Sequence, residues 1–441
     1  MPRSRVAGVV LALGVIATGA AATSLHATNA VTEPTVNFTA NVESTALYCT
    51  GLGAGTTSGR VTFTNLTGAS RVLAVEVVSN TGAHATRNVA LAAHASTSVS
   101  PLAWVTGTLF GVSAVVSGGG VVGAEVAADN TAVAPCSAGG VTDWYAAGFD
   151  TLVGSSAVVS LFNPSATPAV VNVTTVTANG FSAPAPFQGL AVGPHAEVAV
   201  NLGSQIVDTA NVGVHVNVLR GAVVAVGVQT SASTASFNVG QEALATSAGF
   251  PLVTTAANTR AQVRVANPND VPASVTVAVA LGTYQIAPET VEVPAYASAV
   301  VIITPNSAIP AAGFAALTLT SSEPVAAALA VGATDLALSA PGPLARTWLV
   351  SDFSGRGFSR AVLTNTGKES VSIHATNLAT SATFSATLAA GASSDVRALL
   401  PGLVKLQGLT LLVTSDRPVA MTTILPLSRV GPIVTSALDG G

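Results

Sequence analysis

The chain has 441 residues and a formal net charge of −4, and charged residues make up only 8% of it. This weak negative charge offers no basic surface to nucleic acid, so nucleic-acid binding is set aside as a function class. The apolar share is 49% and is carried by Ala and Val, whereas aromatic residues account for 5%. Small and β-branched residues favour strands packed face to face, in several domains of about 100–150 residues each.

Residues 1–30 are predicted to be a signal peptide or an N-terminal membrane anchor. Arg3 and Arg5 precede an apolar stretch from Val6 to Ala22, and Ala20–Ala22 offers a cleavage site for export. The stretch is long for a signal peptide and near the lower limit for a membrane-spanning helix, so cleavage and retention both stay open. In either case the rest of the chain is expected outside the membrane, in an extracellular or cell-envelope location.

A pattern repeated four times reveals how the chain is organised. Each copy contains a short apolar run that ends in an asparagine, and these asparagines are Asn65, Asn163, Asn267 and Asn365. They lie 98, 104 and 98 residues apart by subtraction of their numbers, which is about one β-sandwich domain per interval. An aromatic residue comes 17 to 19 residues before each asparagine: Tyr48, Trp144, Phe250 and Trp348. We interpret the asparagines as turn formers and the aromatic residues as core anchors, with a sugar-stacking platform as the alternative for the latter.

The segments between the asparagines read as strands. A polar turn, an alternating strand, a hairpin, a small-residue corner and a closing pair of strands follow each asparagine. In the third repeat the closing pair flanks a tight turn at Ser321–Pro324. Roughly seven short strands per repeat predict an immunoglobulin-like sandwich. The fold class is therefore predicted to be all-β, a tandem array of four such domains behind the N-terminal segment.

The predicted domain boundaries follow the repeats. Sandwich 1 spans residues 31–140 and holds both cysteines, and the others span 141–245, 246–343 and 344–441. The linkers between them are short, which favours a semi-rigid rod over freely tumbling domains.

The two cysteines fit an oxidising compartment. Cys49 lies before the first asparagine turn and Cys136 near the end of the first repeat, so a disulfide would tie the start of that domain to its finish. In the chain-entropy model a loop of this size contributes roughly 4–5 kcal/mol of stability. The alternative, a reactive thiol, needs a nearby base that the sequence does not show.

The sequence offers no clear catalytic, metal-binding or nucleotide-binding constellation, and no cofactor or metal is expected. Asp129, Asp143 and Asp150 are the nearest approach to an acidic cluster, but they lack the D-x-D-x-D spacing of a calcium loop. Calcium bound between domains by such acids is the alternative. Three arginines in and beside the Gly-rich segment 351–360 form a candidate loop for an anionic polymer, with a solvated loop as the alternative: Arg346, Arg356 and Arg360.

The apolar N-terminal segment, the cysteine pair, and the Trp144-Tyr145 and Trp348 openings before the asparagine turns resemble a known family. It is an uncharacterised family of secreted or membrane-anchored actinobacterial proteins, a domain of unknown function built of immunoglobulin-like β repeats. The resemblance covers about residues 30–440. It implies export and association with the cell envelope, and it assigns no catalytic residue.

We therefore expect a non-catalytic, exported cell-envelope protein, a structural scaffold of tandem sandwiches. Its partner would be an unknown protein or an envelope polysaccharide, and it would meet the membrane only through the N-terminal segment. The alternative is an extracellular protein that binds a glycan or envelope polymer. Positions shared by all four repeats are expected to be scaffold, so function is sought where the repeats differ.

Overall fold

The computed structural model describes residues 44–53, 59–127, 132–231, 235–254, 260–282, 284–309, 313–332, 337–339, 344–351, 360–378, 380–400, 410–424 and 432–433. These residues all belong to one compact unit, Val42–Gly441, and the predicted signal or anchor at residues 1–30 lies outside them. Within the described ranges no helix has the length and apolar character needed to span a membrane.

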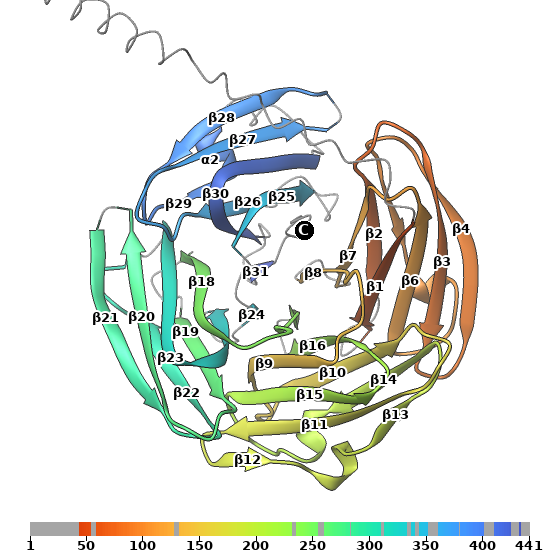
Figure 1. The fold of residues 1–441 in the computed structure, drawn as a ribbon, viewed down its shortest axis with the longest axis horizontal. Coiled ribbons are helices and arrows are strands. Elements are labelled where there is room, and N and C mark those ends of the chain that lie inside the picture. Colours follow the sequence, from red (N-terminus) through yellow and green to blue (C-terminus); the bar gives the residue numbers. More distant parts are fainter. Residues whose placement is uncertain are drawn as a thin grey trace, which may run out of the picture. The chain divides into compact units, whose positions relative to one another are not determined.

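The first repeat folds into two four-stranded sheets, ordered β1-β6-β3-β4 and β5-β2-β7-β8 (Figure 1). Its strands alternate between buried and exposed residues, as in β3, where Leu73 and Val75 are fully buried and Val72 is 58% exposed. The elements are β1 (Ser44–Leu52), β2 (Arg60–Asn65), β3 (Arg71–Ser79), β4 (His84–Leu91), β5 (Ser96–Val99), the 3₁₀ turn η1 (Pro101–Ala103), β6 (Phe110–Ser117), β7 (Val121–Val126) and β8 (Val133–Pro135).

The second repeat follows the same order of strands. One sheet runs β14-β10-β16-β17, and β11, β15 and β9 form the other side. The elements are β9 (Asp143–Phe149), β10 (Ser156–Asn163), β11 (Ala169–Thr177), β12 (Gly180–Ser182), η2 (Ala185–Phe187), β13 (Leu190–Val192), β14 (Ala196–Asn201), η3 (Leu202–Ser204), β15 (Val212–Arg220), β16 (Val224–Thr230) and β17 (Ala235–Asn238).

The third and fourth repeats each close with one long strand instead of two short ones. The third repeat comprises β18 (Ala245–Thr254), β19 (Arg260–Asn267), β20 (Ala273–Leu281), β21 (Tyr284–Val293), β22 (Ala297–Thr304), β23 (Gly313–Gly332) and β24 (Ala337–Ser339). The fourth comprises β25 (Ala345–Ser351), β26 (Arg360–Thr364), β27 (Val371–Asn377), β28 (Thr383–Leu388), β29 (Ser393–Asp395), the short helix α2 (Val396–Leu399), β30 (Thr410–Ile424) and β31 (Pro432–Ile433).

The tight turn predicted at Ser321–Pro324 is wrong, because β23 passes through these residues without interruption. The first half of β23 pairs with β18 and β20, and its second half pairs with β19 and β24. One strand thereby belongs to both sheets of the repeat. Polar residues lie in the middle of β23, where the strand leaves one sheet and enters the other. These polar residues are the reason why the sequence predicts a turn here.

Each repeat has its own principal hydrophobic core. Three of the four predicted anchors are buried in these cores, since Trp144 is 2% exposed and Phe250 and Trp348 are 0% exposed. The fourth, Tyr48, is half-buried and meets Phe162 of the second repeat edge-on, at 6.5 Å between ring centroids. The core interpretation therefore holds for the indoles, and neither of them offers a surface for stacking on a sugar.

The cores also join one repeat to the next. Val226, Val228 and Phe237 of the second repeat pack in the core of the first. Leu66 of the first repeat packs against Leu349 and Leu412 of the fourth, so the first and last repeats touch.

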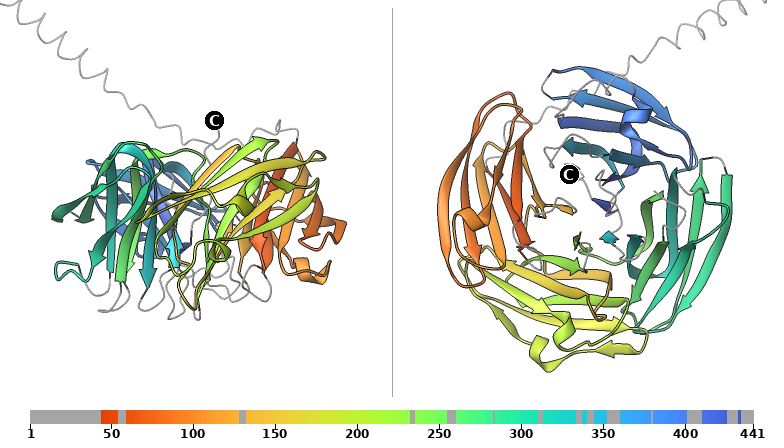
Figure 2. Two further views of the ribbon diagram at one scale, coloured as in Figure 1. Left: turned by 90° about the horizontal axis from the view of Figure 1, so that it is seen from below. Right: turned by 180° about the vertical axis from the view of Figure 1, so that it is seen from behind.

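Within the Val42–Gly441 unit the small sheets are arranged as a propeller (Figure 2). The all-β class is confirmed, whereas the tandem array of immunoglobulin-like sandwiches is not supported. The contact between the first and fourth repeats also contradicts the semi-rigid rod. The sequence pattern shows which residues are buried but not whether a residue of the same repeat or of another covers them. The domain boundaries stay predictions.

In every repeat, the asparagine side chain forms hydrogen bonds to two different loops. Asn163 is fully buried, and its Nδ2 donates to the carbonyl oxygens of Thr167 at 2.8 Å and of Val192 and Gly193 at 3.0 Å. Its Oδ1 accepts from the backbone amide of Ser165 at 3.0 Å and from the Ser165 hydroxyl at 2.7 Å. The turn after β10 is thus tied to the corner after β13. The other three make the same kind of bonds at both loops: Asn65, Asn267 and Asn365.

We predict that Asn163→Asp lowers the free energy of unfolding by about 2–4 kcal/mol, because three carbonyl oxygens lose their donor and face a carboxylate instead. Urea denaturation of the full chain measures the change. The matched control is Asn179→Asp at the exposed turn between β11 and β12, which is expected to shift stability by less than about 0.5 kcal/mol. Equal effects of the two substitutions would contradict the structural role of Asn163.

Candidate functional site

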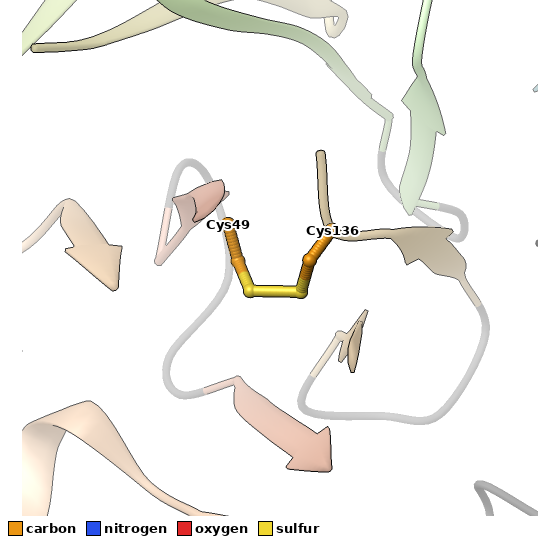
Figure 3. The surroundings of a disulfide bond; sticks show 2 residues. All are labelled: Cys49 and Cys136. Carbon is orange, nitrogen blue, oxygen red and sulfur yellow. A yellow bond between two sulfur atoms is a disulfide. The ribbon is translucent and has the colours of Figure 1, made fainter. Parts of the chain in front are cut away.

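The predicted disulfide is present. Cys49 in β1 and Cys136 just after β8 are bonded, with 4.5 Å between their Cα atoms (Figure 3). Since β1 and β8 belong to different sheets of the first repeat, the bond ties these sheets together. A disulfide of this kind indicates an oxidising, extracellular environment.

A cavity of about 200 Å³ lies beside the disulfide, where the first repeat meets the second. Cys136, Trp144 and Val226 line it, and the Trp144 indole donates to the carbonyl oxygen of Val239 at 2.7 Å. Two carboxyl groups also line it. Glu242 is exposed, whereas Glu125 in β7 is fully buried.

A second buried carboxyl group, Glu197 in β14, belongs to the same junction. Its side chain is from the second repeat, is 4% exposed, and accepts at Oε1 from the hydroxyl of Thr50 in the first repeat at 2.5 Å. The hydroxyl of Ser160 in β10 also donates to this oxygen and lies 3.0 Å from the Thr50 hydroxyl. Two hydroxyl groups from different repeats therefore share one carboxylate oxygen.

Three carboxylate oxygens at this junction have no hydrogen-bond partner among the described residues: Oε1 and Oε2 of Glu125 and Oε2 of Glu197. The described residues also hold no ion-pair partner for either carboxyl group. Buried carboxyl groups without partners are costly, so this pair is the most unusual feature of the core.

A β-bulge in β1 explains how Thr50 reaches the second repeat. The pairing of β1 with β6 shifts between Cys49 and Leu52, and Gly51 has a φ of +96°. A Cβ at Gly51 would come within 3.0 Å of a Val228 methyl group, so the backbone here packs directly against the second repeat. The bulge therefore directs Thr50 out of its own sheet and onto Glu197.

Burial changes the acidity of both carboxyl groups. Burial raises the pKa of Glu197 to about 7, even though the hydrogen bonds from Ser160 and Thr50 act in the opposite direction. Burial, and then the charge of Glu197, raise the pKa of Glu125 well above its ordinary value. The backbone amide of Thr50 acts in the opposite direction and lowers this pKa, although neither oxygen of Glu125 makes a well-formed hydrogen bond.

The junction between the second and third repeats also contains buried charged side chains, but here the two charges are opposite. Arg264 in β19 donates from Nη1 to the carbonyl oxygen of Gly148 at 2.6 Å and to Asp150 at 2.8 Å. Gly148 has a φ of +93° and lies in a bulge of β9 that corresponds to the one at Gly51. The side chains of Arg264 and Asp150 are 6% and 15% exposed, so this junction is balanced in charge and shielded from water.

A small surface cavity of about 70 Å³ lies near the same junction and is lined by Tyr145, Thr174, Phe181 and His215, among others. The rings of Tyr145 and His215 are stacked, with 4.2 Å between centroids and 9° between planes. The His215 Nε2 lies 3.0 Å from Asp143 Oδ1. Burial alone would raise the pKa of Asp143, but hydrogen bonds from His215 and Asn217 outweigh it and lower that pKa below its ordinary value.

The predicted polymer-binding loop lies mostly outside the described residues, so it stays a prediction. Arg346 is exposed in β25, Arg360 begins β26 with its side chain outside the described part, and Arg356 lies outside the described residues altogether. Of the three aspartates considered, Asp143 and Asp150 serve separate contacts, and Asp129 is not among the described residues. In the described part of the chain no group of three or more His, Cys, Asp or Glu side chains could hold a metal ion.

Sequence reasoning missed the Glu125–Glu197 pair. Glu125 pairs in register with Val61, and the matching positions of the later repeats are Gly227, Leu329 and Thr423. Glu197 stands where the other repeats have serine, at Ser96, Ser298 and Ser393. A charged residue at a core position of one repeat was the available signal, but only the structure places the two glutamates at one junction.

We predict that stability falls as pH rises, in buffer free of divalent cations. The pKa of Glu197 is about 7 in the folded chain, above its ordinary value of 4.5, so the folded state holds this proton more tightly than the unfolded state. The stabilisation is complete below about pH 4.5 and is lost through pH 7, which amounts to about 3 kcal/mol. Glu125 acts in the same direction, because its pKa is also raised above its ordinary value.

Denaturation of the wild-type chain and of Glu197→Gln between pH 5 and pH 8 checks this dependence. The substitution is expected to flatten the profile, whereas Glu242→Gln, at the exposed edge of the same cavity, is expected to leave it unchanged. A profile that rises with pH, or one that Glu197→Gln does not alter, would contradict the prediction.

Comparisons with known proteins give a family but no activity. No curated protein matches the chain. Among solved structures, the crystal structure of a tetra-tandem repeat in the extending region of a large adhesion protein is 12% identical, covering 90% of this chain and 100% of that one, with a TM-score of 0.13. A score this low carries no argument. A model described as a family of unknown function, DUF5719, matches residues 127–399, which is more than half of the sequence. The expected resemblance to a domain of unknown function is thus confirmed over these residues, and the chain belongs to the DUF5719 family.

Proposed function

We propose that the protein is a non-catalytic, exported scaffold of the cell envelope whose repeats act together as one rigid body. The observation that carries this proposal is the character of the contacts between repeats. Arg264 binds both Gly148 and Asp150 across one junction, and Thr50 binds Glu197 across another. Buried, directional contacts of this kind fix the orientation of neighbouring repeats, which a scaffold requires and a flexible tether does not.

Export from an actinobacterial cell is part of the proposal. The disulfide supports an oxidising location. Two lysines against fourteen arginines in the sequence support a host with a GC-rich genome. The apolar segment from Val6 to Ala22 supplies the export signal or the anchor.

We predict that Arg264→Ala lowers the free energy of unfolding by about 3 kcal/mol, because it leaves Asp150 and the Gly148 carbonyl without their buried partner. It is also expected to speed limited proteolysis of the native chain. The matched control is Arg417→Ala, which removes an exposed ion pair with Glu369 and is expected to cost less than about 1 kcal/mol. Denaturation and proteolysis of both variants measure the difference.

Fractionation of cells that express the full chain completes this test. The wild-type protein is expected in the envelope or the culture medium, with Cys49 and Cys136 bonded to each other and therefore unreactive to maleimide. A cytosolic protein with reactive thiols would contradict export. Envelope retention of Arg264→Ala equal to that of the wild type would contradict the need for a rigid body.

A second candidate function is binding of an envelope glycan at the cavity lined by Tyr145 and His215. The observation in its favour is a group of accessible aromatic rings: Phe181 is 54% exposed, Tyr296 is 43% exposed, and the two meet edge-to-face at 5.9 Å. Polar side chains, including Asp143, lie beside the stacked rings. Aromatic faces next to hydrogen-bonding groups are the surface that sugar rings bind.

For the glycan candidate, co-sedimentation of the purified chain with insoluble cell-wall polysaccharide is the measurement. The double substitution Phe181→Ala and Tyr296→Ala is expected to weaken binding about tenfold, because two stacking surfaces are removed. Val153→Ala, at a position 94% exposed, serves as the control for loss of an exposed apolar side chain. No sedimentation of the wild-type chain, or equal sedimentation of the variants, would rule out this candidate.

A further inference from the structure

The glutamate pair at the first junction has no positively charged partner among the described residues. Glu125 and Glu197 are 0% and 4% exposed, and the charge of Glu197 acts on Glu125 across the junction. No Lys, Arg or His side chain of the described residues forms an ion pair with either. Two buried carboxylates without a countercharge are strongly unfavourable.

Protonation would remove the negative charge of the pair but would leave some of its polar atoms without hydrogen-bond partners. A protonated Glu125 would still carry a hydroxyl group without an acceptor and a carbonyl oxygen without a donor, since both of its oxygens lack partners. Each unsatisfied buried group destabilises the fold. Water in the adjoining cavity can supply hydrogen bonds but no charge.

We infer that this junction is a binding site for a divalent cation, with calcium as the ion that its chemistry fits best. The oxygens available to the ion are the three unpartnered carboxylate oxygens of Glu125 and Glu197. The hydroxyl groups of Thr50 and Ser160 surround the same carboxylate. An all-oxygen set of carboxylates and hydroxyls is typical of Ca²⁺, which tolerates irregular geometry and completes its coordination with water.

Two observations beyond the pair of acids support this site. The oxygens of Glu125 are fully buried and unpartnered, and Glu125 lines a cavity of about 200 Å³ beside the junction. The four side chains also come from both sides of the junction, Thr50 and Glu125 from the first repeat and Ser160 and Glu197 from the second. A cation held here would join the two repeats, as Arg264 joins the second and third. The sequence prediction of no metal is revised by this inference.

The first experiment follows the thermal midpoint of the full, disulfide-bonded chain at pH 7.5, in EDTA and in increasing CaCl₂. A saturable rise of roughly 3–8 °C is expected. Glu125→Gln and Glu197→Gln are expected to abolish the rise, whereas Glu242→Gln, at the edge of the same cavity, retains it. Elemental analysis after gel filtration is expected to find one calcium per chain in the wild type.

Terbium luminescence tests the site in the wild-type chain and so does not depend on whether the variants fold. Trp144 lines the same cavity as Glu125 and can sensitise a bound Tb³⁺ ion. Excitation of the indole is expected to yield Tb³⁺ emission that Ca²⁺ displaces and that Mg²⁺ displaces more weakly. Absence of this emission, or a calcium response that survives both glutamine substitutions, would overturn the site. A failure here leaves the proposed scaffold function standing, because that function rests on the junction contacts alone.

Discussion

The buried asparagine amide is the interaction on which every repeat depends. At the end of the strand that holds it, the chain turns and leaves carbonyl oxygens inside the protein, where no strand can pair with them. Asn163 supplies two donor hydrogens and one acceptor from a single side chain, and these serve the turn at Ser165 and Thr167 and the corner at Val192 and Gly193. Aspartate lacks the donors, and glutamine is one methylene longer. This explains why the same residue returns in all four repeats.

The position three residues before each asparagine differs in residue type from one repeat to the next, whereas the asparagine does not. It is occupied by Thr62, Ser160, Arg264 and Val362 in turn. Thr62 bonds to Ser98 of its own repeat, whereas the other three contact the preceding repeat. Ser160 touches Thr50 and Glu197, Arg264 reaches Gly148 and Asp150, and Val362 packs with Phe314. The asparagine thus preserves each repeat, while the residue three positions before it contributes to the contact of repeats two, three and four with the preceding repeat.

The sequence predicted the features that depend on contacts within one repeat. These are the all-β class, the asparagine turns, the burial of Trp144 and Trp348, and the bond between Cys49 and Cys136. It did not predict the propeller arrangement, because burial of a leucine such as Leu66 looks the same in the sequence whether its own repeat or the fourth repeat covers it. The continuous strand β23 was missed for a similar reason, since polar residues between two sheets resemble a turn.

The glutamate pair was beyond sequence reasoning because Glu125 and Glu197 lie 72 residues apart by subtraction of their numbers and in different repeats. What distinguishes their junction from the next is the balance of charge. Arg264 and Asp150 neutralise each other inside the chain, so that junction needs no charge from the solution. The two glutamates carry charges of the same sign, and the hydroxyl groups around them cannot neutralise these charges. The first junction is therefore neutralised only by protons or cations from its surroundings, and through it the composition of the medium can act on the fold.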